Sequence, residues 1–180
     1  MVPVGSADDG NATSAGALPN GAFETEVLAR LRRSGFRIDR DGEFQHEGEP
    51  VRHEGLRQAL FRWLDSLPDG RTILRLDANR YAYVDVDDTP LVARAARIAG
   101  DHVFLALSDA REEVLDPTSL TLDDTGVMRC RVRSGSDNGS GSLEVRLATS
   151  AATVVADLIQ ERPAGPTIVW AGQSVLLKRR

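Results

Sequence analysis

The spacing of apolar residues along the chain predicts three helices. The clearest covers 54–67 and is followed at once by the turn residues Pro68-Asp69-Gly70. Its apolar face carries Leu56, Leu60, Trp63, Leu64 and Leu67. A lead helix is predicted over 23–33, and a third over 151–162 with Ser150 as its N-cap.

Alternation of apolar and polar residues predicts strands between these helices. A hairpin is predicted from 36–39 and 43–46. The other predicted strands are 72–76, 81–86, 92–98, 102–107, 120–123, 127–133, 143–147, 167–170 and 174–177. In the strand 81–86, one face carries Tyr81, Tyr83 and Asp85.

Two short segments, 38–44 and 122–128, share one pattern: an apolar residue, an aspartate, two polar residues and a glycine. Asp-x-x-Gly favours a tight turn between two strands. We therefore predict an α+β fold of two similar hairpin-helix-strand subdomains with mixed and antiparallel sheets. The predicted limits are a disordered tail over 1–20, a first subdomain with the lead helix over 21–117, and a second subdomain over 118–180.

Composition and charge narrow the range of functions. The chain has 180 residues and a formal net charge of -5, which disfavours broad affinity for nucleic acid or for an anionic membrane. No apolar stretch approaches the length of a transmembrane helix, and residues 1–20 are not predicted to be a secretory signal. Cys130 is the only cysteine, which fits a reducing compartment. A cytoplasmic location is predicted, with no membrane and no nucleic-acid partner.

Three segments are informative together: the run 36–44, Pro50-Val51-Arg52 with the helix after it, and Val86-Asp87-Asp88-Thr89-Pro90-Leu91. They resemble segments of a bacterial family catalogued as domain of unknown function 1285. The segments 145–147 and 169–172 are similar more loosely, so the chain resembles a divergent member. The resemblance implies two similar α+β subdomains and a role in ligand sensing or signalling, and it supplies no catalytic residues.

One group of side chains is predicted to bind a ligand. The two tyrosines of the chain combine an apolar ring with a polar tip on one strand face, beside an acidic turn. The predicted ligand-binding residues are Tyr81, Tyr83, Asp85, Asp87, Asp88, Arg52 and Trp170. Each has a structural alternative: the tyrosines as a packed sheet face, the acids as turn caps before Pro90, Arg52 as an ion-pair partner and Trp170 as a core residue.

The sequence contains no recognisable catalytic or metal-binding motif. His46, His53 and His102 show no metal-ligand spacing, and the acidic run lacks the regular oxygen ligands of a calcium loop. Cys130 alternates with apolar residues and is predicted to be a core side chain. The arginines of 127–133, with Arg146 opposite, are predicted to form a solvated sheet face. No catalytic residue, metal or cofactor is therefore predicted.

The predicted function is a small-ligand-binding or regulatory module that uses a cleft between the two subdomains. Two alternatives remain open. A hydrolase-type enzyme would need a histidine or paired carboxylates in a cleft. A protein-interaction or dimerisation module would expose a large apolar face. The sequence leaves the ligand and the oligomeric state undetermined.

Overall fold

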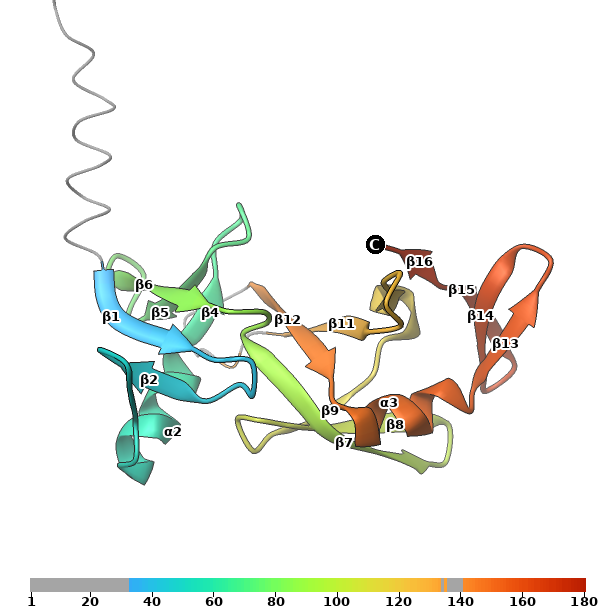
Figure 1. The fold of residues 1–180 in the computed structure, drawn as a ribbon, viewed down its shortest axis with the longest axis horizontal. Helices are drawn as coiled ribbons and strands as arrows, with labels where there is room; N and C mark the ends of the chain where they lie inside the picture. The colour runs from blue at the N-terminus through green and yellow to red at the C-terminus, as the bar shows by residue number, and fades with distance from the viewer. Residues whose placement is uncertain (1–32, 134, 136–140) are drawn as a thin grey trace, which may run out of the picture. The chain divides into compact units, whose positions relative to one another are not determined.

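The computed structural model describes residues 33–133, 135 and 141–180. Within these ranges two α-helices, a short 3-10 helix and sixteen strands form mixed and antiparallel sheets, which confirms the α+β class (Figure 1). The predicted tail over 1–20 and the lead helix over 23–33 lie outside the described residues, except that Arg33 begins the first strand.

The first sheet has the strand order β3-β2-β1-β6-β5-β4. Its strands are β1 Arg33–Ile38, β2 Phe44–His46, β3 Glu49–Pro50, β4 Leu64–Ser66, β5 Thr72–Arg75 and β6 Tyr81–Val86. Helix α2, Glu54–Trp63, lies between β3 and β4 in the chain and begins where His53 Nδ1 accepts a hydrogen bond from the Leu56 amide, at 3.2 Å. Strands β1 and β6 pair in parallel, while the other pairs of this sheet are antiparallel.

The second sheet has the order β16-β10-β11-β12-β7-β8-β9, and a third sheet has the order β13-β14-β15. The second sheet contains β7 Leu91–Ala99, β8 His102–Leu107, β9 Glu112–Val114, β10 Thr121–Leu122, β11 Met128–Arg133, β12 Ser142–Leu147 and β16 Lys178–Arg179. The third contains β13 Ile159–Arg162, β14 Gly165–Trp170 and β15 Gln173–Leu176. The 3-10 helix η1 covers Pro117–Ser119, and helix α3 covers Thr149–Ala156.

The chain follows the same path twice. In each repeat a hairpin leads to a third strand, a helix and a three-stranded meander. A strand then pairs in parallel with the first strand of the hairpin: the last strand of the meander in the first repeat, and a separate strand after the meander in the second, where the meander forms a sheet of its own. That parallel pair is β6 with β1 in the first repeat and β16 with β10 in the second. The predicted similarity of the two units is therefore present in their topology.

Strands β7, β8 and β9 stand between the two repeats in sequence and belong to the second sheet. Strand β7 pairs in parallel with β12, with Leu91 opposite Val145. The chain therefore passes from the first sheet to the second at 87–90, ahead of the predicted limit at 117/118. Whether residues 21–117 and 118–180 form separate subdomains stays a prediction.

Both predicted helices of the described chain are too long. Helix α2 ends at Trp63, and Leu64 instead pairs with Leu74 in strand β4. Helix α3 ends at Ala156, and the predicted last turn is strand β13, where Ile159 pairs with Ile168. Ladder hydrogen bonds with distant strands override the local helical spacing at both ends. The predicted N-cap Ser150 is also wrong, because Ala148 is the N-cap and the Ser150 hydroxyl donates to the Arg94 carbonyl.

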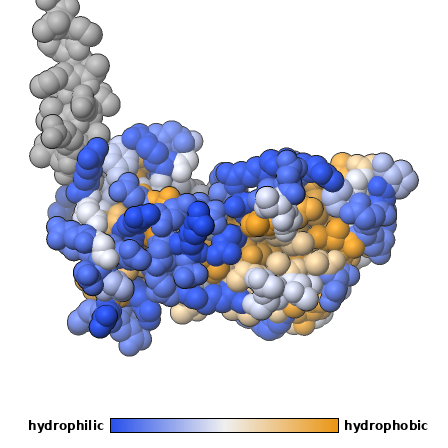
Figure 2. Space-filling view, in the orientation of Figure 1, coloured by the Kyte–Doolittle hydropathy of each residue, from blue (hydrophilic) through white to orange (hydrophobic). Residues whose placement is uncertain are grey.

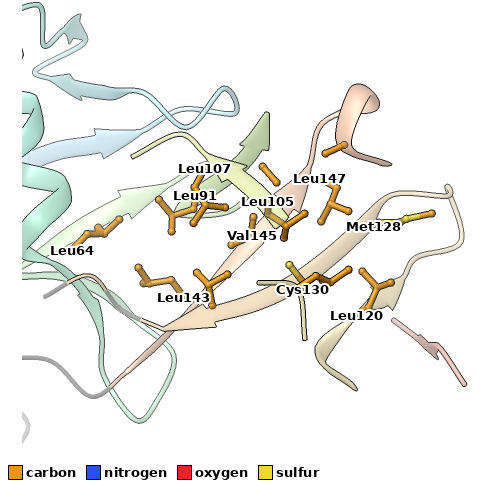
Figure 3. Close-up of a cluster of buried hydrophobic side chains, with 14 of the residues drawn as sticks. Leu64, Leu91, Leu105, Leu107, Leu120, Met128, Cys130, Leu143, Val145 and Leu147 are labelled. Carbon is orange, nitrogen blue, oxygen red and sulfur yellow. The ribbon is translucent and has the colours of Figure 1, made fainter. Parts of the chain in front are cut away.

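One continuous apolar core joins the first two sheets. Leu64 of the first sheet belongs to the same buried cluster as Leu91, Leu105, Leu143 and Val145 of the second (Figure 3). These side chains are at most 1% exposed. Each contributes about 1.5–3 kcal/mol through the burial of apolar surface. The two sheets are therefore held together by a shared core as well as by the connecting segment 87–90.

Candidate functional site

A cavity of about 370 Å³ lies where the two repeats meet the segment that connects the sheets. Arg40 comes from the first Asp-Gly turn, Val127 and Arg129 from the second hairpin, and Arg146 from β12. The connecting segment contributes Asp87 and Asp88. Residues from both repeats thus line one small polar space.

Asp88 bridges two arginines across this cavity. Its Oδ1 accepts from Arg129 Nη2 at 3.0 Å, and its Oδ2 lies 2.9 Å from Arg146 Nε. The side chains of Asp88, Arg129 and Arg146 are 22%, 16% and 24% exposed. This partial burial lowers the local screening by water, so the bridge is stronger than an ion pair on the open surface.

A second carboxylate holds Arg129 from the other side. Arg129 Nη1 donates to Asp123 Oδ2 at 2.7 Å. The hydrogen bond from the Thr125 hydroxyl, followed by those from Arg129 and the Val127 amide, keeps the pKa of Asp123 well below its ordinary 3.8. The same pair raises the pKa of Arg129 above its ordinary value. Asp123 is thus an anion at neutral pH and fixes the orientation of Arg129.

Arg146 links the cavity to both sheets. Its Nη2 donates to the Arg40 carbonyl at 2.6 Å, and its amide donates to the Thr89 hydroxyl at 3.3 Å. Thr89 is 1% exposed, and its hydroxyl also donates to the Leu91 carbonyl at 2.8 Å. The first turn, the connecting segment and β12 are therefore held in one hydrogen-bonded arrangement.

Asp87 joins the connecting segment to strand β1 of the first sheet. Its side chain forms an ion pair with Arg37 of β1, and its amide donates to the Ile38 carbonyl at 3.0 Å. Of the predicted ligand-binding residues, only Asp87 and Asp88 are among the described residues that line this cavity.

The two predicted tyrosines lie together but away from that lining. Their rings pack edge to face with centroids 5.7 Å apart. Arg71 lies over the Tyr83 ring at 4.7 Å from its centroid, and Arg71 Nη1 donates to the Tyr83 hydroxyl at 2.9 Å. Tyr81 and Tyr83 thus form a half-buried polar and aromatic surface on β6.

The remaining predicted residues occupy three other places. Asp85 is exposed on β6, opposite Arg37 of β1. Arg52 is exposed between β3 and α2. Trp170 ends β14, and its indole Nε1 donates to the Asp101 carbonyl at 2.9 Å. The seven residues do not converge on one cavity, and a ligand contact for these three stays a prediction.

Three arginines of the cavity were not predicted as ligand-binding residues from the sequence. Arg129 and Arg146 are opposite each other on β11 and β12, but the predicted solvated face is wrong for these two residues, because their side chains are 16% and 24% exposed and pair with carboxylates. Their carboxylate partner Asp88 lies 41 residues before Arg129, in the connecting segment 87–90. The alternation of arginine with apolar residues on β11 predicts a polar strand face. It does not predict that Asp88 is the partner of these arginines.

The histidines have structural partners outside this cavity. His46 packs on Phe36 with ring centroids 4.7 Å apart, and His102 packs on Phe104 at 6.1 Å. His53 caps α2. Within the described ranges, no group of three or more His, Cys, Asp or Glu side chains is placed to hold a metal ion. Burial raises the pKa of Cys130 to about 12, so its thiol stays protonated at neutral pH.

The distribution of exposed apolar side chains is relevant to the alternative of a protein-interaction or dimerisation module. In the space-filling view, apolar side chains gather between β11 and α3, whereas the surface over β1 and β2 is mainly hydrophilic (Figure 2). The large apolar residues that are most exposed lie on separate segments of the chain: Leu56, Leu76, Ile98, Val114 and Leu176. None of the described helices has the length and apolar composition to span a bilayer.

Comparison with known proteins yields structural neighbours. No family model matches the chain, and no curated protein matches it. A DUF1285 family protein from Silicibacter pomeroyi DSS-3 is similar in structure with a TM-score of 0.65 and 18% identity, covering 81% of this chain and 80% of that chain. A DUF1285 family protein from Shewanella baltica OS155 is similar with a TM-score of 0.54 and 17% identity. The match covers 68% of this chain and 91% of that chain.

These neighbours define the class to which the fold belongs. The chain is an α+β protein of two repeats, and it shares the fold of two DUF1285 family proteins. The resemblance seen in the sequence is thus confirmed, and at these identities the likeness is one of fold. The family is a domain of unknown function, so the likeness names no ligand.

Proposed function

We propose that this protein is a small-ligand-binding module with a regulatory role, and that its ligand binds in the cavity lined by Arg40, Asp87, Asp88, Arg129 and Arg146. One observation carries the proposal: a single polar cavity takes its lining from both repeats and from the segment that joins the sheets. A ligand there would contact the first turn, the second hairpin, β12 and the connecting segment at once, so its binding could favour one arrangement of these elements over another.

A thermal-shift screen of the full chain tests this proposal. A ligand that binds only the folded state at a hundredfold excess over its Kd stabilises it by roughly 2.7 kcal/mol. For a chain of this length the expected rise in Tm is about 5–10 °C. The panel contains nucleotides, amino acids, sugars, organic acids and divalent ions.

Two tryptophan variants place the ligand. Val127→Trp adds a large side chain to the cavity lining, whereas Ile98→Trp adds one at an exposed site on β7. The stabilisation by the ligand should be lost in Val127→Trp and kept in Ile98→Trp. Equal loss in both variants, or equal retention, contradicts binding in this cavity.

The Tyr81 and Tyr83 surface is a further part of the proposal. In the same screen, Tyr83→Phe removes the hydroxyl that Arg71 contacts and leaves the ring in place. A weaker ligand shift in this variant would extend the site to β6. An unchanged shift would assign the two tyrosines to packing alone.

The alternatives predict other results. A hydrolase requires a histidine or paired carboxylates in a cleft. The three histidines serve as ring-packing partners and a helix cap, and the two carboxylates of the cavity, Asp87 and Asp88, are each ion-paired with arginine. A dimerisation module requires association, which a solution mass measurement of the same sample detects. A cytoplasmic location remains part of the proposal.

A further inference from the structure

The cavity between the repeats has more hydrogen-bond donors than acceptors. Arg129 donates through Nη1 and Nη2, and Arg146 through Nε and Nη2. Arg129 Nε and Arg146 Nη1 have no acceptor among the described residues. The exposed Arg40 side chain also has no ion-pair partner in the described ranges. A ligand rich in acceptors complements this lining.

The charge of the lining points the same way. Three arginines and two aspartates line the cavity; Asp87 is paired with Arg37, and Arg129 is paired with Asp123 as well as Asp88, which leaves one arginine charge in excess. The lining is therefore positive in a chain whose formal net charge is -5. Asp88 shows which group fits between Arg129 and Arg146, because its two carboxylate oxygens each face one guanidinium.

We propose that the ligand of this cavity carries an oxyanion, a phosphate or carboxylate group, which binds Arg129, Arg146 and Arg40 in competition with the Asp88 carboxylate. This inference rests on the proposed function, and it adds the chemical class of the ligand. The competition has a structural consequence. Asp88 lies in the segment that connects the sheets, so an oxyanion that takes over its arginines releases the Asp88 side chain, while the backbone amide of Arg146 and the Leu91 carbonyl still hold Thr89.

The experiment titrates the ¹⁵N-labelled full chain with inorganic phosphate, pyrophosphate and citrate at constant ionic strength, and follows the amides of Asp87, Asp88 and Val127. Phosphate and citrate separate the two oxyanion sources, and either one binding supports the class. Arg146→Gln and Arg40→Gln should each weaken binding, Arg146→Gln by at least about tenfold. Asp88→Asn should tighten binding several-fold, because the amide is a neutral competitor.

Matched controls carry the same changes of charge elsewhere. Arg97 and Glu112 form an exposed ion pair between β7 and β9, so Arg97→Gln and Glu112→Gln should leave the affinity unchanged. An Arg97→Gln effect as large as that of Arg146→Gln, or weaker binding in Asp88→Asn, overturns the inference. Arg40→Gln serves if the other variants fail to fold, because Arg40 is exposed.

The failure of this inference is distinguishable from that of the proposed function. If an uncharged or cationic compound of the thermal-shift panel, titrated in the same way, moves these three amides and no oxyanion does, the ligand-binding site stands and its oxyanion specificity is refuted. If no compound moves them, both proposals fail.

Discussion

Asp39 and Asp123 occupy the same place in the two repeats and make the same contacts. The Oδ1 atom of each accepts from the amides two and four residues later, at 2.9–3.0 Å. The Oδ2 atom of each accepts from the side chain six residues later, Gln45 at 2.9 Å and Arg129 at 2.7 Å. The carbonyl of each also accepts from the amide of the turn glycine. The two turns are therefore equivalent in atomic detail, and the second supplies Arg129 to the cavity.

We predict that alanine destabilises the fold more at Gly42 than at Gly126, the two turn glycines. Gly42 and Gly126 have φ angles of +75° and +84°, so alanine is strained at either position by about 1–2 kcal/mol. A Cβ at Gly42 would also lie 2.9 Å from Ser108 Oγ and 3.1 Å from Val92 Cγ2, whereas one at Gly126 meets nothing within 4 Å. Urea unfolding should show that Gly42→Ala costs at least about 1 kcal/mol more than Gly126→Ala. Equal losses would mean that the first turn moves freely away from β7 and β8.

Asp123 predicts a pH-dependent contribution to stability. Its hydrogen bonds hold its pKa in the folded protein below the 3.8 of the unfolded chain. The carboxylate therefore stabilises the fold fully above pH 3.8, and this contribution is lost as the pH falls from there toward the lower folded pKa. Asp123→Asn should reduce the free energy of unfolding at neutral pH, and the difference from wild type should shrink in acid. Urea unfolding across this pH range measures it.

The control for this prediction is the neighbouring acid. Asp124 is exposed, so Asp124→Asn changes the same charge without removing the turn contacts. Its effect on unfolding should be small at every pH. A pH-independent loss in Asp123→Asn would assign the contribution of Asp123 to geometry rather than to charge.

The buried ion pair of Asp65 and Arg75 predicts a large loss on removal of one partner. Asp65 is 0% exposed and accepts from Arg75 Nε at 2.6 Å, while its Oδ1 has no hydrogen-bond partner among the described residues. Arg75→Met leaves a buried carboxylate without a counter-charge, which costs about 3–5 kcal/mol. Denaturant unfolding should show this loss, and Asp65→Asn with Arg75→Met should restore part of it.

An exposed pair in the turn after β5 serves as the comparison. Arg80 and Asp77 are 76% and 39% exposed, so Arg80→Met should cost at most about 1 kcal/mol. A similar loss in Arg75→Met and Arg80→Met would show that the buried Asp65 carboxylate loses its counter-charge at little cost.

We predict that the thiol of Cys130 reacts only slowly with alkylating reagents in the folded protein. The side chain is 1% exposed, and burial raises its pKa to about 12, so the reactive thiolate is scarce at neutral pH. Iodoacetamide should label the native protein far more slowly than the unfolded protein, as mass spectrometry can follow. In Cys130→Ala with Ser174→Cys, the exposed thiol on β15 should react promptly in the native state. Rapid labelling of native Cys130 would reveal frequent opening of the core strand β11.

Local chemistry along the sequence determined much of this fold. Strands β6 and β8 begin and end where alternation predicts, and both Asp-x-x-Gly hairpins form. The reason is that these features depend on neighbours within a few residues: the turn aspartate binds nearby amides, and side chains alternate across a strand. Cys130 is buried for the same reason, since its strand faces the core with alternate residues.

Tertiary structure decided the rest. The segments 64–66 and 159–162 become strands because β5 and β14 offer ladder partners that no local pattern reveals. The same holds for the cavity, where Asp88 meets Arg129 across 41 residues of sequence. Sequence spacing could name acids and aromatic residues suited to binding, but only long-range strand pairing brought Asp87 and Asp88 beside the arginines and left Tyr81, Arg52 and Trp170 elsewhere.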